Sequence, residues 1–184
     1  MAEPTSSLQS KINRAVRAHL IAQGVGTVLD TFAAPTADDR ILPNTTILTG
    51  ELAEETKYTG NWRGLVMVSL RDEAAIQPGE INPNLSWVAA NTRLTNISNV
   101  LREIGTNGLL TYTALALTAA GRAMAVSDGS AEGDLLALDN ADMADFTCFW
   151  FSATDLRPPT RNEEGTFWES ELAFDVVACN GIFN

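Results

Sequence analysis

The stretch 165–180, GTFWESELAFDVVACN, alternates apolar and polar side chains with the two-residue period of a β-strand. One face of this strand carries Trp168, Ser170, Leu172, Phe174 and Val176. The other face carries Glu169, Glu171, Ala173, Asp175 and Val177. The pattern predicts a strand that buries its first face in a core. It leaves open whether the acidic face meets water, a substrate or a neighbouring subunit.

The run before it, DFTCFWFSA at 145–153, also has strand character and carries aromatic side chains on both faces. A strand that is apolar on both faces is expected to be central in its sheet or covered on both sides. The intervening segment 155–165 contains Pro158 and Pro159 and is predicted to be an exposed hairpin loop. The two strands therefore form a predicted antiparallel hairpin over 145–180.

A first hairpin is predicted over 44–71 by the same alternation. Its strands are 44–54, NTTILTGELAE, and 62–70, WRGLVMVSL, and the polar segment 54–61 joins them. The stretch 24–43 contains two prolines and an acidic pair, and is predicted to be a connector.

Helical periodicity predicts three helices. The first covers 6–23, with Ser6 and Gln9 in capping-box spacing and Gly24 as its stop. Its apolar stripe is Leu8, Ile12, Ala15, Val16 and Leu20. Its other side carries Lys11, Arg14 and Arg17, and the one histidine, His19, is interpreted as structural. The other helices cover 84–104 and 108–126; the last is nearly uncharged, so we expect burial on most sides, in part by other subunits.

The order of these elements is helix, strand, strand, helix, helix, strand, strand. It predicts a single α+β domain over 1–184, with an N-terminal helical part (1–24), a helical middle (84–126) and the two hairpins. The hairpins build a four-stranded antiparallel sheet with the helices packed on one face.

The charge, the cysteines and the lack of long apolar runs exclude several classes of function. The net charge is -11, from 23 acidic and 12 basic residues, so a free chain repels phosphate and is a poor candidate for gripping nucleic acid or anionic lipid. Cys148 and Cys179 lack metal-site spacing and are expected to be reduced and buried. The N-terminus has no signal pattern and no apolar run approaches about 20 residues, so we expect a cytoplasmic product without a membrane span.

Motifs for chemistry are scarce, and we predict no catalytic residue, metal or cofactor. There is no GxSxG, no GxGxxG and no GxxxxGK[ST]. The carboxylates of Glu169, Glu171 and Asp175 recur every about 7 Å on one strand face, a spacing near that of glycosidase pairs. A solvated or interface face has the same pattern and is the favoured interpretation. Arg63 is expected to pair with a strand-face acid such as Glu51.

Three tryptophans, Trp62, Trp150 and Trp168, fall in predicted strands. Burial in the core is the default expectation for each of them, and one or two of the group are expected to lie at a subunit interface instead.

The runs ADFTCFWFSATD, TFWESELAFDVVACN and TGELAEETKYTGNWRGLVMVSLRDEA resemble the tail-terminator or neck proteins, also called head–tail completion proteins, of tailed bacteriophages. The resemblance covers 44–73 and 141–180 and the order of elements. It implies a virion protein, assembled in the host cytoplasm, that forms a ring with itself, expected to be a hexamer. The ring ends tail-tube growth, contacts the tail tube protein and the head–tail connector protein, and lets DNA pass without specific binding.

That resemblance also implies which residues make contacts. The exposed hairpin ends contribute Lys57, Tyr58, Trp62, Arg63, Arg157 and Arg161. The acidic face of Glu169, Glu171 and Asp175 would meet the lumen or a neighbour, with Arg14 and Arg17 as candidate partners. The alternatives are another virion component (a head–tail adaptor or a tube subunit), a carboxylate-based hydrolase, or a ligand-binding module with a closed apolar pocket.

Overall fold

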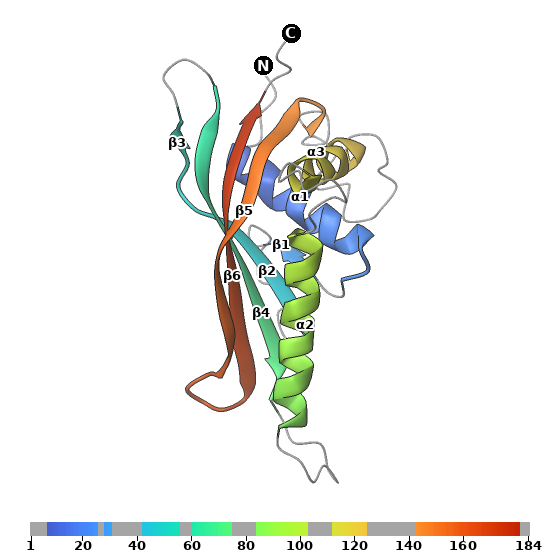
Figure 1. Ribbon diagram of the computed structural model, residues 1–184, viewed down its shortest axis with the longest axis vertical. Helices are drawn as coiled ribbons and strands as arrows, with labels where there is room; N and C mark the ends of the chain where they lie inside the picture. Colours follow the sequence, from blue (N-terminus) through green and yellow to red (C-terminus); the bar gives the residue numbers. More distant parts are fainter. Residues whose placement is uncertain are drawn as a thin grey trace, which may run out of the picture.

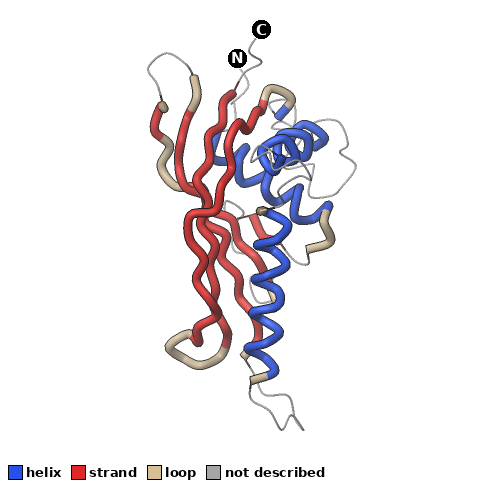
Figure 2. Tube along the Cα trace, in the orientation of Figure 1, coloured by secondary structure: helices blue, strands red, loops and turns tan. Residues whose placement is uncertain are grey.

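The computed structural model describes residues 7–25, 28–30, 42–55, 60–74, 84–102, 112–124 and 143–180. One twisted sheet forms a layer on one side of the molecule, and the helices form a second layer on the other side (Figures 1 and 2). The elements in chain order are α1 (Leu8–Ala22), β1 (Val28–Asp30), β2 (Asn44–Thr49), β3 (Ala53–Glu54), β4 (Trp62–Glu73), α2 (Leu85–Leu101), α3 (Tyr112–Met124), β5 (Phe146–Arg161) and β6 (Phe167–Asn180). The chain is therefore an α+β protein, as predicted.

The sheet has six strands in the described residues, with the order β1-β2-β4-β6-β5 and with β3 paired to β4. The four predicted strands are present in two antiparallel hairpins, and β4 and β6 join the hairpins side by side. The strand β1 lies in the stretch predicted as a connector and pairs in parallel with β2. It has three residues, too few for alternation to reveal it.

The core lies between the sheet and the helices. Val66 and Val68 of β4 are paired in register with Phe174 and Leu172 of β6, and all four are fully buried. The alternation predicted for 165–180 is therefore confirmed on its core face. The Phe151 ring stacks on Phe174 at 4.6 Å between centroids, which joins β5 to the same core.

Helix α1 buries its predicted apolar stripe, but more than that stripe is covered. Its N-cap is Ser7 rather than Ser6: the Ser7 hydroxyl accepts a hydrogen bond from the Ser10 backbone N–H at 3.2 Å. Gly24, at φ +73°, ends the helix as predicted. Lys11 and Arg14 were placed on the side opposite the stripe, yet both are buried. The reason is that α1 packs against α3 as well as against β1 and β2.

The predicted strand 44–54 is interrupted at 50–52. The cause lies opposite, at Gly64 of β4, where a Cβ atom would meet the Glu51 carbonyl oxygen at 2.8 Å. The segment between β2 and β3 thus runs beside β4 as a bulge, at a distance that only glycine permits. Beyond the interruption, β3 and β4 form an arm that extends away from the helical layer (Figure 1).

Strand β5 differs most from expectation. It is an edge strand rather than a central one, and Phe149 is exposed because a register shift between Cys148 and Trp150 takes it out of the alternation. It also continues to Arg161, through the segment predicted as a loop. Proline is tolerated at edge strands and bulges, and Pro158 and Pro159 lie in the irregularity between Arg157 and Thr160. The hairpin turn is therefore confined to 162–166.

Helices α2 and α3 begin and end inside the predicted ranges 84–104 and 108–126. The predicted burial of the last helix on most sides is not found within this chain, because α3 leaves Leu115, Ala119 and Ala123 exposed along one stripe. None of the helices in the described ranges has the length and apolar character needed to cross a bilayer.

Candidate functional site

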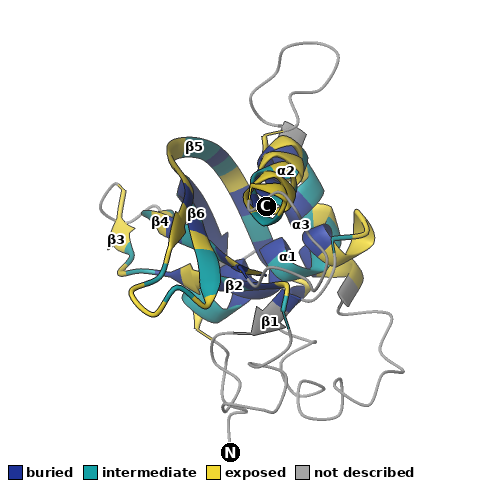
Figure 3. Cartoon of the chain, turned by 90° about the horizontal axis from the view of Figure 1, so that it is seen from below, coloured by how far each residue is buried: buried dark blue, intermediate teal, exposed yellow. Residues whose placement is uncertain are grey.

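The face of the sheet that lacks helices is defined here as the open face. It consists of the alternate residues of β2, β4, β6 and β5 that point away from the core, and Figure 3 shows the helices gathered on the opposite side. Its members include Thr46, Leu48, Arg63, Leu65, Met67, Ser69, Arg71, Arg157, Glu169, Glu171, Ala173 and Asp175.

The acidic side chains of β6 meet arginines of the same chain on this face. Arg63 of β4 binds Asp175 in a bidentate manner, with Nε 3.2 Å from Oδ1 and Nη2 3.0 Å from Oδ2. Its Nη1 lies 3.2 Å from the carboxylate of Glu55. Arg63 therefore has a strand-face acid as its partner, as predicted, but that acid is Asp175 rather than Glu51.

The other two acids of β6, Glu169 and Glu171, pair with arginines of the neighbouring strands β4 and β5. Arg71 of β4 lies directly opposite Glu169, with its Nε 3.4 Å from the carboxylate. Arg157 of β5 lies directly opposite Glu171, with Nη1 at 3.9 Å, and its Nε is 3.4 Å from Asp155. Exposed pairs of this kind contribute at most about 1 kcal/mol each to stability.

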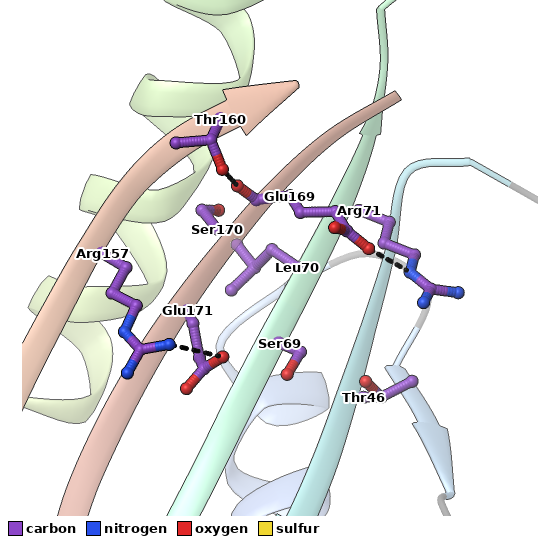
Figure 4. Close-up of a pocket in the computed structure, with 9 residues that line it drawn as sticks. All are labelled: Thr46, Ser69, Leu70, Arg71, Arg157, Thr160, Glu169, Ser170 and Glu171. Atoms are coloured by element: carbon purple, nitrogen blue, oxygen red, sulfur yellow. Dashed lines mark hydrogen bonds and ion pairs between the residues drawn. The ribbon is translucent and has the colours of Figure 1, made fainter. Parts of the chain in front are cut away.

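These side chains surround a pocket of about 330 Å³ (Figure 4). Arg157 and Glu171 stand on one side of it, and Arg71 and Glu169 stand on the other. Hydroxyl groups of Thr46, Ser69 and Thr160 complete the polar lining. The pocket is thus built for charged or hydrogen-bonding groups rather than for an apolar ligand.

The open face also exposes apolar side chains. Leu48 is 46% exposed and Leu65 is 48% exposed, and Met67, which pairs with Leu48 across β2 and β4, is half-buried beside them. Trp62, at the start of β4, is 38% exposed rather than buried in the core as expected, but it alternates with Val66 and Val68 and so belongs to the other side of the sheet. Apolar groups flanked by ion pairs are typical of surfaces that contact other proteins.

Of the other predicted contact residues, Arg161 stacks over the Trp168 ring at 5.1 Å from the centroid. Lys57 and Tyr58 lie outside the described residues. Arg14 is buried, and Arg17 donates from Nε to the Val28 carbonyl at 3.0 Å. Both belong to α1, on the helical side of the sheet, where Arg17 is half-buried; their pairing with the acids of a neighbour stays a prediction.

Several residues that organise the site were missed. Arg71 would have been found if the alternation of 62–70 had been extended by one residue, because it follows Ser69 on the same face. Asp72 and Arg93 form a buried ion pair, Nη1 to Oδ2 at 3.0 Å, between β4 and α2. Burial raises the pKa of Asp72 above 3.8, although the neighbouring Arg93 opposes that shift. No local sequence pattern predicts this ion pair, because its two residues are 21 positions apart.

The two thiols are free and buried, as predicted. Burial raises the pKa of Cys148 to about 12, and it also raises the pKa of Cys179. Thiols that stay protonated are poor nucleophiles and poor metal ligands. Within the described ranges, no group of three or more His, Cys, Asp or Glu side chains is arranged to hold a metal ion.

No protein-family model matches the chain, and no curated protein is similar to it.

Proposed function

We propose that this chain is a structural protein of a tailed-bacteriophage particle, which forms a ring at the head-proximal end of the tail, ends tube growth and joins the tail to the head connector. The observation that carries the proposal is the resemblance of 44–73 and 141–180 to tail-terminator and neck proteins, together with the same order of helices and strand pairs.

The open face supports a role in protein contacts. It combines exposed Leu48 and Leu65 with a row of ion pairs that keep its acids oriented. A ring needs two different contact surfaces on each copy, so that copies join head to tail and close. The open face and the ends of the two hairpins are candidates for such surfaces.

The edge strand β5 is protected against pairing with a strand of another copy. Contacts between copies are therefore expected through sheet faces and hairpin ends. Near its start, Thr118 of α3 bonds the Cys148 backbone and Arg122 bonds the Phe146 carbonyl. Near its end, Pro158 and Pro159 lack backbone N–H groups. Bulges, prolines and covering side chains are ways in which proteins prevent pairing of an edge strand with another chain.

The carboxylate-hydrolase alternative is less well supported. Glu169 and Glu171 line the same pocket, but each of them contacts an arginine across its strand, and Asp175 likewise binds Arg63. Glu169→Gln with Glu171→Gln is expected to leave any hydrolytic background of the preparation unchanged in a glycoside-hydrolysis assay.

The test of the proposed function uses the full chain and the particle that contains it. Native mass spectrometry at micromolar concentration is expected to give a closed oligomer, and electron microscopy a ring at the junction of head and tail. Particles made without the protein are expected to yield unjoined heads and tails of uncontrolled length. A monomeric chain that is missing from the particle would refute the proposal.

A further inference from the structure

We infer that the acidic turn of the β5–β6 hairpin of one copy binds the arginine-lined pocket on the open face of the next copy. This inference rests on the proposed function, because it names the contact that would build the ring. The turn comprises Asn162–Thr166 and carries Glu163 and Glu164. The pocket is the one bounded by Arg71 and Arg157, and the acids that pair with them, Glu169 and Glu171, line it too.

Hydrogen bonds fix the backbone of the turn that carries the two acids. The Asn162 side-chain oxygen accepts hydrogen bonds from the backbone N–H groups of Thr166 at 2.8 Å and Phe167 at 3.1 Å. Gly165, at φ +71°, closes the turn, and its N–H donates to the Asn162 carbonyl. Glu163 and Glu164 are exposed at the tip, and neither makes an ion pair with another described residue. A preorganised acidic tip loses little conformational freedom on binding.

The pocket offers guanidinium groups that retain binding capacity. The side chain of Arg157 is 67% exposed while that of Glu171 is only 26% exposed, so an approaching carboxylate meets the arginine first. The contacts of Arg157 with Glu171 and Asp155 are long, at 3.9 and 3.4 Å. A guanidinium has five N–H donors, so it can bind a second carboxylate without leaving its first partner. The hydroxyl of Ser69 supplies a further donor at the same place.

The tip does not pair with the pocket of its own chain, because the ion-pair partners of Arg71 and Arg157 in the described residues are Glu169, Glu171 and Asp155. The β5–β6 ladder is paired up to Arg161 and Trp168, which holds the turn beyond the end of the strands (Figure 1). The acids and the arginines therefore meet only between two copies. Since the tip and the pocket are different surfaces, the contact is heterologous and repeats around a ring.

The experiment exchanges charge between the two surfaces. The tip variant is Glu163→Arg with Glu164→Arg, and the pocket variant is Arg71→Glu with Arg157→Glu. Each variant alone places like charges at every contact. The protein concentration at which half of the chains are assembled is therefore expected to be about tenfold or more above that of the wild type. Mixed in equal amounts, the two variants have complementary charges at every contact in an alternating ring. The mixture, and a chain that carries all four changes, are therefore expected to regain the wild-type mass in native mass spectrometry.

Two controls keep the result specific. Arg102→Glu makes the same change at an exposed position of the α2 C-cap and is expected to leave the mass unchanged. The milder Arg71→Gln with Arg157→Gln weakens assembly without adding repulsion, and circular dichroism checks that each variant is folded.

The outcomes separate the two proposals. Suppose that the wild type forms a ring. If both single-surface variants still form it, or if neither the mixture nor the fourfold variant restores it, the tip-to-pocket contact is refuted while the proposed ring stands. A wild-type chain that forms no ring refutes both.

Discussion

At the residue scale, Gly64 shows how one small side chain shapes the first hairpin. A Cβ atom at this position would lie 2.8 Å from the Glu51 carbonyl oxygen and 2.5 Å from the end of the Leu52 side chain. The backbone oxygen cannot move away without disturbing the bulged segment 50–52. The sequence shows a glycine within a strand, which is a sign of close backbone approach, but it does not show which segment approaches.

We predict that Gly64→Ala lowers the free energy of unfolding by about 1–3 kcal/mol, because the added methyl group must displace the bulged segment 50–52. The matched control is Gly50→Ala, where the nearest atom to a new Cβ lies at an ordinary 3.7 Å. The control is expected to change stability by less than about 1 kcal/mol. Urea titration of both variants measures the difference, and equal effects would show that the bulge is not packed tightly against Gly64.

At the element scale, β5 shows why a strand pattern does not reveal its place in a sheet. Aromatic residues on both faces favour a central strand, yet β5 is at the edge and helix α3 covers the start of it. Thr118 of α3 accepts a hydrogen bond from the Cys148 N–H at 2.9 Å, which replaces the missing neighbouring strand. The sequence predicted both hairpins and their alternation, because those are local. It did not predict that the inner strands would be β4 and β6.

Thr118→Val should lower the free energy of unfolding by about 1–3 kcal/mol, since the shape is kept while the Cys148 N–H loses its acceptor. Thr95→Val in α2 is the control, because Thr95 is exposed and its hydroxyl donates to the Asn91 carbonyl of its own helix and to no other described residue. Its expected effect is within about 0.5 kcal/mol. Thermal unfolding followed by circular dichroism compares the two, and a neutral Thr118→Val would mean that the edge needs no such acceptor.

At the scale of the whole molecule, α2 is attached to the sheet by polar contacts as well as by its apolar face. Arg93 binds Asp72 and also the hydroxyl of Thr45 on β2. Further along, the Trp87 indole donates to the Pro159 carbonyl at 3.2 Å and the Trp168 indole donates to the Ser86 hydroxyl at 3.1 Å. These contacts hold the far half of the long hairpin against α2, and so they set the position of the acidic turn and of the pocket.

Arg93→Met is predicted to destabilise the fold by about 3–5 kcal/mol at neutral pH, because it leaves the buried Asp72 carboxylate without its counter-charge. Adding Asp72→Asn should restore most of that loss. The raised pKa of Asp72 gives the sign of the pH dependence. The folded protein holds this proton more tightly than the unfolded chain, so the contribution of Asp72 to stability is complete below about pH 3.8 and falls as the pH rises through the folded-state pKa.

Removing Arg93 takes away an attraction that lowers this pKa, so the Arg93→Met variant should lose stability with rising pH more steeply than the wild type. The double variant lacks the titrating group and should not show this slope. Urea titrations at several pH values between 4 and 7 measure it, and identical slopes in all three proteins would contradict the assignment to Asp72.

The sequence by itself determined the α+β class, the two hairpins, the three helices and the buried face of β6. These follow from side-chain periodicity, which is a local property of the chain. Only the tertiary structure decided that β5 lies at the edge, that Lys11 and Arg14 are buried, and that the acids of β6 face Arg63, Arg71 and Arg157. Register and layer packing bring together residues more than a hundred positions apart, as with Arg63 and Asp175, and no local pattern encodes which partner a charged side chain meets.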